Sequence, residues 1–93
     1  MKIDITKKYT LTKITSISEV GRNSDIHDGY WAEGKLADIP SVGEKLMIYR
    51  DSNSVNPDGK YGIFYSSPVQ DLNHQENSIE IKTQNSIYKL EEY

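Results

Sequence analysis

Apolar residues in this 93-residue chain recur with a period of two, and no segment of ten residues shows a helical period. Turn signals separate six or seven such segments at the spacing typical of a sandwich or barrel. A chain this short protects its strand edges best by curling them together. We therefore predict an all-β fold with no long helix, a small single-domain β-barrel of about six short antiparallel strands over residues 1–93.

The first predicted strand begins at Met1, where apolar and polar residues start to alternate. The same parity continues through Leu11 and extends to Lys13. It changes at Ile14, which indicates a bulge or the end of the strand near Thr15.

A polar loop over residues 19–29 leads to the second predicted strand, residues 30–36. In a regular strand Tyr30 and Trp31 point to opposite faces, so one of the two lies near the surface. Gly34 inside this strand predicts a bulge or a close approach of another backbone.

The Pro-Ser-Val-Gly turn at residues 40–43 begins the most hydrophobic strand, which has Leu46 and Ile48 on one face and Met47 and Tyr49 on the other. Such a strand, apolar on both faces, is expected near the centre of the sheet.

Residues 51–59 are the most polar stretch and are predicted to form an exposed loop. The return strand over residues 61–67 should end or bend at Pro68, which cannot donate to a strand ladder, and resume over residues 69–72.

The last predicted hairpin turns at Gln84 and Asn85. This register places apolar pairs on one face and an ion pair on the other, whereas a shift by one residue sets Glu80 against Glu91. The expected pairs are Thr83 with Ser86, Ile81 with Tyr88, Glu80 with Lys89, and Ile79 with Leu90.

Composition excludes several classes of protein. The absence of cysteine excludes disulfides, thiolate metal sites and a cysteine nucleophile, and it fits a cytoplasmic location. No apolar run approaches the roughly 20 residues that span a bilayer, and residues 1–5 lack the apolar core of a signal peptide, so we expect no membrane partner. The net charge of −3 argues against a nucleic-acid partner.

Two local clusters carry histidine and carboxylates, and neither has a spacing that requires a metal. His27 lies between Asp25 and Asp28, and His74 lies near Asp71 and Glu76. No phosphate loop, nucleophile elbow or zinc-protease motif accompanies them. We predict that the protein is not an enzyme and needs no metal or cofactor.

The leading functional hypothesis is a non-catalytic module that binds a protein partner, with one aromatic anchor and a rim of polar loop and tail residues. The candidate contact residues are Tyr30 or Trp31, with Asp51, Asn53, Asn56, Asp58, Glu91 and Glu92.

Two alternatives stay open. A small-ligand or nucleotide-binding barrel would use Arg22, His27, Arg50 and Tyr65. A barrel that binds single-stranded nucleic acid would stack bases on its aromatic residues in a basic groove. In addition, pairing of an edge strand across a twofold axis would give a homodimer.

One part of the chain resembles a known domain. Gly34-Lys35-Leu36, then Val42 to Ile48, then Ser66 to Leu72 are similar to the second, β-barrel domain of translational GTPases. This chain has no GTPase domain, and its connection over residues 37–41 is longer. The resemblance implies a barrel and nothing about translation. The predicted barrel is of the SH3-like or translation-factor-like type.

In overall profile, the chain is similar to the small, acidic, cysteine-free proteins that phages and other mobile elements use against host defences, such as anti-CRISPR proteins. This similarity implies an inhibitor that binds a host defence enzyme directly.

Overall fold

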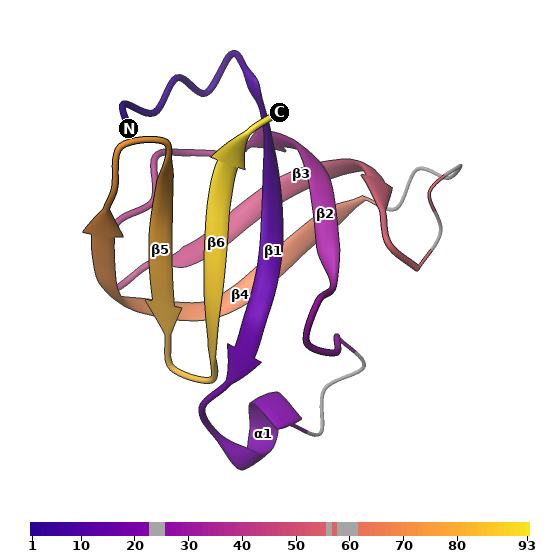
Figure 1. Ribbon diagram of the computed structural model, residues 1–93, viewed down its shortest axis with the longest axis vertical. Coiled ribbons are helices and arrows are strands. Elements are labelled where there is room, and N and C mark those ends of the chain that lie inside the picture. The colour runs from indigo at the N-terminus through magenta and orange to yellow at the C-terminus, as the bar shows by residue number, and fades with distance from the viewer. Residues whose placement is uncertain (23–25, 56, 58–61) are drawn as a thin grey trace.

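Six antiparallel strands close into a barrel in the computed structural model, which describes residues 1–22, 26–55, 57 and 62–93 (Figure 1). The elements are β1 (Lys8–Ser16), α1 (Glu19–Arg22), β2 (Trp31–Leu36), β3 (Lys45–Asn53), β4 (Ile63–His74), β5 (Ser78–Thr83) and β6 (Ser86–Glu92). Each strand pairs with the next along the chain, and β6 returns to pair with β1. The predicted all-β barrel of about six strands is confirmed.

The two ends of the barrel differ. Both chain termini and the β4–β5 turn lie at one end, the upper end in Figure 1, which we refer to as the terminal end. At the other end, the helix end, α1 packs against the β5–β6 turn, where a Cβ on Gly21 would come within 2.2 Å of the Asn85 carbonyl oxygen. The Ile17 amide also donates to that oxygen at 2.9 Å. The β5–β6 turn therefore supports α1.

Inward side chains from all six strands fill the interior. The ring of Phe64 contacts Tyr30 in a stacked arrangement and Tyr88 edge to face, each with centroids 5.9 Å apart. Such pairs add to the stabilisation that comes from burying the rings. The core consists of Tyr9, Leu11, Tyr30, Ala32, Leu36, Leu46, Ile48, Phe64, Val69, Ile79, Ile81, Tyr88 and Leu90.

Two predicted irregularities are present. The β1–β6 register shifts between Lys13 and Thr15, so Ile14 is the predicted bulge and the strand continues beyond it. The β2–β3 register shifts at Gly34, where an added Cβ would come within 1.8 Å of the Tyr49 carbonyl oxygen. Both devices increase the local twist and help a small sheet curl into a barrel.

The β5–β6 hairpin has the predicted register. Ile79 pairs with Leu90, Glu80 with Lys89 and Ile81 with Tyr88. At the turn, the Ser86 amide donates to Thr83 Oγ1 at 3.1 Å, and that hydroxyl donates to the Ser86 carbonyl at 2.9 Å. Parity fixes this register because a shift would place apolar residues on the outer face.

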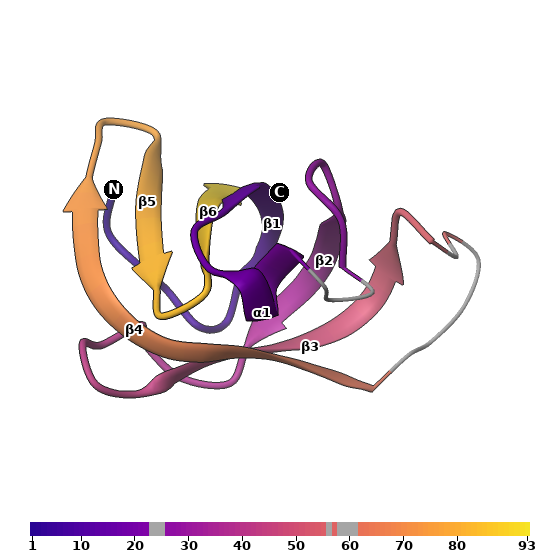
Figure 2. The same cartoon turned by 90° about the horizontal axis from the view of Figure 1, so that it is seen from below.

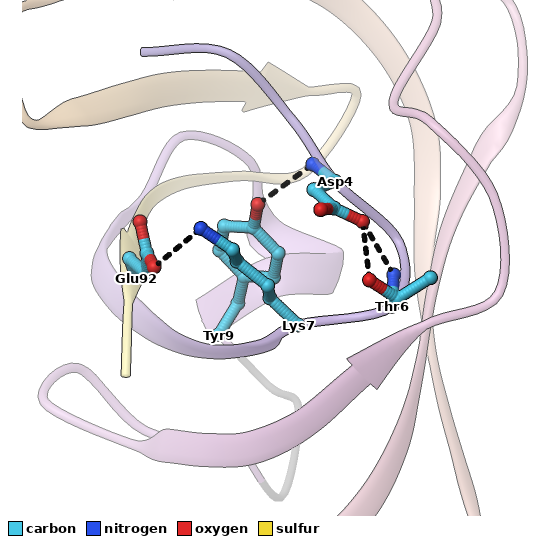
Figure 3. A network of polar contacts seen from close by, with 5 residues as sticks. All are labelled: Asp4, Thr6, Lys7, Tyr9 and Glu92. Carbon is cyan, nitrogen blue, oxygen red and sulfur yellow. Dashed lines mark hydrogen bonds and ion pairs between the residues drawn. The ribbon is translucent and has the colours of Figure 1, made fainter.

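The prediction that the first strand begins at Met1 is wrong, since β1 begins at Lys8. The Asp4 carboxylate accepts hydrogen bonds from the amide and hydroxyl of Thr6, at 2.9 and 2.6 Å, and the chain turns there (Figure 3). Met1 and Ile3 nevertheless pack against the core. Their alternation reflects a segment that crosses the terminal end of the barrel, not a strand.

Both predicted loops are shorter than expected. Residues 19–22 form α1, where the Ser18 hydroxyl accepts a hydrogen bond from the Gly21 amide at 3.0 Å. Residues 51–53 belong to β3 because pairing with β2 continues as far as Ala32 opposite Asn53. Asp25, Asn56, Asp58 and Tyr61, which the sequence analysis also placed, lie outside the described residues.

Pro68 does not end its strand. β4 pairs with β3 as far as Pro68 and with β5 from Val69 onward, and Figure 2 shows the strand bending between the two neighbours. Proline, which has no backbone N–H, fits the position where β4 changes its neighbour from β3 to β5, because the hydrogen bonds between the strands are interrupted there. Closure gives each described strand two neighbours, so the edge strand that the homodimer alternative requires is not found among them.

The turn at Asp4 predicts a measurable titration. The hydroxyl and the amide of Thr6 hold the pKa of Asp4 below its ordinary value because they stabilise the ionised carboxylate. The resulting contribution to stability is present above the unfolded-state pKa and is lost as the pH falls through the lower folded-state pKa. In a carbon-detected NMR titration, Thr6→Ala should move the Asp4 midpoint upward, towards that of a free aspartate. An unchanged midpoint would contradict this assignment.

Candidate functional site

Four outward side chains form an apolar group on the outer surface of β3 and β4. Met47 lies directly opposite Tyr65, and Tyr49 lies opposite Ile63. We refer to Met47, Tyr49, Ile63 and Tyr65 as the tyrosine face. Tyr49 is 51% exposed and Tyr65 54% exposed, while Met47 and Ile63 are partly buried between them. Parity explains this placement, since Leu46, Ile48 and Phe64 point into the barrel from the same strands.

A hollow adjoins the tyrosine face at Met47. Its volume is about 480 Å³, and it lies between the β2–β3 connection and β3. Ile39 and Pro40 supply apolar lining from the connection, and Ile39 is 57% exposed. The exposed apolar surface therefore continues from Tyr65 through Met47 into a depression.

Charges of both signs surround this apolar surface. Lys35 on β2 lies opposite Tyr49, and Lys45 precedes Met47 on the same face of β3. Neither lysine forms an ion pair with a described residue. Asp38 and Glu44 line the hollow. An apolar centre with a mixed polar rim is the usual anatomy of a protein interface.

The two predicted aromatic anchors, Tyr30 and Trp31, differ in exposure. Tyr30 is 6% exposed and stacks on Phe64 inside the barrel, so it cannot be a surface anchor. Trp31 is partly exposed at the start of β2, where its amide donates to Ser54 Oγ at 3.1 Å. Of the two, Trp31 is the one available to a partner.

Three of the predicted acidic contact residues are exposed or partly exposed and are already in ion pairs. Asp51 contacts Lys8 at 3.0 Å, Glu92 contacts Lys7 at 3.3 Å (Figure 3), and Glu91 contacts Lys89 at 3.7 Å. Donation of a hydrogen bond to Glu92 raises the pKa of Lys7, and donation to Asp51 raises the pKa of Lys8. Exposed pairs of this kind contribute little to stability because solvent and salt screen them.

Asn53, a further predicted contact, is only 3% exposed and its Oδ1 accepts the Val55 amide at 3.0 Å. It serves the turn after β3 and is not on the surface. Asn56 and Asp58 are outside the described residues.

A second cavity, of about 510 Å³, lies at the helix end. It brings together Arg22 and His27, two of the four residues predicted for a small ligand. The other two lie elsewhere. Arg50 reaches inside the barrel, where its Nη1 donates to the Tyr30 hydroxyl at 3.2 Å, and Tyr65 belongs to the tyrosine face.

Lys13 also lines this cavity, and the sequence analysis did not select it as a functional residue. Lys13 is 2% exposed, and its Nζ donates hydrogen bonds to the carbonyls of Gly21 at 3.1 Å and Ile26 at 2.5 Å. Parity with Leu11 indicated that Lys13 points inward, but the two carbonyls that hold its ammonium come from a connection whose path the sequence does not fix.

The two histidines do not meet. His27 lines the cavity at the helix end, while His74 ends β4 at the terminal end, beside Gln75, whose carbonyl accepts a hydrogen bond from the N-terminal ammonium of Met1. In the described part of the chain, no three histidine, aspartate or glutamate side chains are grouped as metal ligands.

Comparison with known proteins found no matching family model, no matching curated protein and no matching solved structure. The resemblances to the translational-GTPase barrel and to anti-defence proteins therefore stay predictions. Among the described residues, the helix is too short and too polar to cross a bilayer.

The contacts of Lys13 predict a local effect. Lys13→Met removes two charge-assisted hydrogen bonds that hold α1 and the Ile26 segment to β1. Native-state hydrogen exchange at the Arg22 amide, which donates to Ser18 at 3.0 Å, should accelerate about tenfold, as expected for losing over 1 kcal/mol locally. The matched variant Lys82→Met, on the exposed face of β5, should leave this amide unchanged. Equal acceleration in both variants would contradict this role.

Proposed function

We propose that this protein is a non-catalytic binding module that contacts a protein partner through the tyrosine face. The observation that carries the proposal is the cross-strand placement of two half-exposed tyrosines with Met47 and Ile63 between them. Tyrosines anchor many interfaces because they bury a large apolar ring and still offer a hydroxyl. The hollow beside Met47 supplies a depression into which a partner side chain can insert.

The closed barrel supports recognition by side chains. Every described strand has two neighbours in the barrel, although β4 pairs with β3 only up to Pro68 and with β5 only from Val69, so a partner strand could extend the sheet over short segments at most. Outward side chains are then the available contacts, and the tyrosine face is the apolar group among them with two exposed aromatic rings. The proposal thus moves the contact away from the acidic residues Asp51, Glu91 and Glu92, which are in ion pairs.

A protein partner is favoured over single-stranded nucleic acid. Two rings that base stacking would use, Tyr30 and Phe64, are 6% and 3% exposed inside the barrel. The rim of the tyrosine face carries carboxylates as well as lysines, and the chain has a net charge of −3. Phosphate recognition needs a clear excess of Lys and Arg, and this surface lacks that excess among the described residues.

The narrower hypothesis makes the partner a host defence enzyme and the protein a phage or mobile-element inhibitor in the cytoplasm. It rests on the sequence profile alone and stays a prediction. The tyrosine face supplies a surface through which such an inhibitor would act, since covering an enzyme's substrate site requires no catalytic group of its own.

The proposal is tested by affinity capture from a lysate of the source cells, with the double variant Tyr49→Ser/Tyr65→Ser. Loss of two central aromatic anchors should reduce recovery of a stoichiometric partner by about tenfold or more, because such truncations cost over 1 kcal/mol each. Tyr93→Ser is the matched control, since Tyr93 is 69% exposed but lies at the terminal end, where its ring contacts Lys8.

Equal recovery by the wild-type protein, the double variant and the control would overturn the proposed contact surface. Failure of the wild-type protein to recover any stoichiometric partner would count against the binding function itself. Unchanged far-UV circular dichroism and melting temperature establish that the variants are folded.

A further inference from the structure

We infer that the cavity at the helix end binds a small oxyanion, either free phosphate or the phosphoryl group of a small molecule. This site is separate from the tyrosine face and goes beyond the proposed function. Its volume of about 510 Å³ lies within the range of small-molecule sites.

Three parts of the chain form the cavity. Thr15 and Ser16 come from the end of β1, Arg22 from the last residue of α1, and His27 and Asp28 from the segment before β2. Both connecting elements are fixed to the barrel. Lys13 holds the Gly21 and Ile26 carbonyls, and the Gly29 amide donates to the Lys13 carbonyl at 2.8 Å. The backbone on either side of the cavity is therefore fixed to the barrel at Gly21, Ile26 and Gly29.

The charge of the lining favours an anion. Lys13 and Arg22 supply two positive charges, and Asp28 is the one carboxylate among the described lining residues. Neither cation forms an ion pair with any residue that the structure describes. Among the described lining residues, the formal positive charges of lysine and arginine therefore outnumber the carboxylates by two to one.

The buried ammonium of Lys13 strengthens the attraction of the cavity for an anion. The two carbonyls satisfy two of the ammonium's donors, but they carry no net negative charge to neutralise it. A buried charge without a counter-ion is costly, and an anion in the adjoining cavity would reduce that cost. The low-dielectric wall of the barrel also strengthens the attraction across this short range.

The remaining lining groups are hydrogen-bond donors suited to phosphate. Arg22 presents the planar fork of donors that matches two oxygens of a phosphoryl group. The Ser16 hydroxyl forms no hydrogen bond with the described residues, so its donor is available. If Lys13 served only to hold α1 to the barrel, the donors of Arg22 and Ser16 would have no reason to line the same cavity.

The probes are inorganic phosphate and adenosine monophosphate, each titrated into ¹⁵N-labelled protein at constant ionic strength set with sodium chloride. We expect saturable shifts concentrated at the amides of Ser16, Gly21 and His27, with the tyrosine-face amides unmoved. Tighter binding of the nucleotide would identify the phosphoryl group of a small molecule as the preferred source, and equal binding would identify phosphate alone. Either result supports the site.

Arg22→Gln should weaken binding of the preferred probe by about fivefold or more, the loss expected for one charge-assisted fork. The matched variant Lys2→Gln removes the same charge from the exposed segment at the terminal end, on the opposite side of the barrel, and should leave the affinity within about twofold, because surface charges more than a Debye length away are screened. Two results would overturn the inference. One is no saturable shift at the cavity with either probe, and the other is equal weakening by the two variants.

Discussion

Pairing of β1 with β6 is the constraint on which the rest of this structure depends. It converts a six-stranded meander into a closed barrel, with register maintained from Tyr9 opposite Glu92 to Ser16 opposite Ser86 across one bulge. Closure leaves each strand with one inward and one outward row of side chains. The inward row supplies the core, and the outward row carries the side chains that remain available to a partner.

The two ends of the barrel are closed differently, and this difference locates the cavity. At the terminal end, the segment before β1 covers the core with Met1 and Ile3 and is held by neutral and exposed charged contacts. At the helix end, the buried ammonium of Lys13 holds the connection in place by donating hydrogen bonds to the Gly21 and Ile26 carbonyls. Burying a charge to hold a loop carries a large desolvation penalty, and it leaves a positive potential at the cavity that the charge lines.

Sequence reasoning predicted the fold where the information is local. The hairpin at Gln84, the bulge at Ile14 and the close approach at Gly34 each follow from parity or residue type within a few positions. It failed where the answer depends on distant neighbours. The sequence around Asp51 is typical of a loop, but β2 pairs with β3 beyond this position. The sequence around Met1 is typical of a strand, but β1 begins only at Lys8.

The candidate site was predictable only in part, for the same reason. Parity separated Tyr49 from Leu46 and Ile48, but the exposure of Tyr49 depends on which face of β3 closes around the core. Tyr30 and Trp31 pose the same question, and the stacking of Tyr30 on Phe64 answers it. Arg22 and His27 were selected together, whereas Lys13 acquires its meaning from carbonyls eight and thirteen residues further along.

The most direct test of this account is the detection of cross-strand nuclear Overhauser effects between β1 and β6. The closed barrel predicts contacts at the Thr10–Glu91 and Leu11–Leu90 pairs, together with slow amide exchange on both sides of β1. If β1 shows such contacts with β2 alone and its other side exchanges as a free edge does, the barrel is open. The sorting of inward and outward side chains described above would then be wrong.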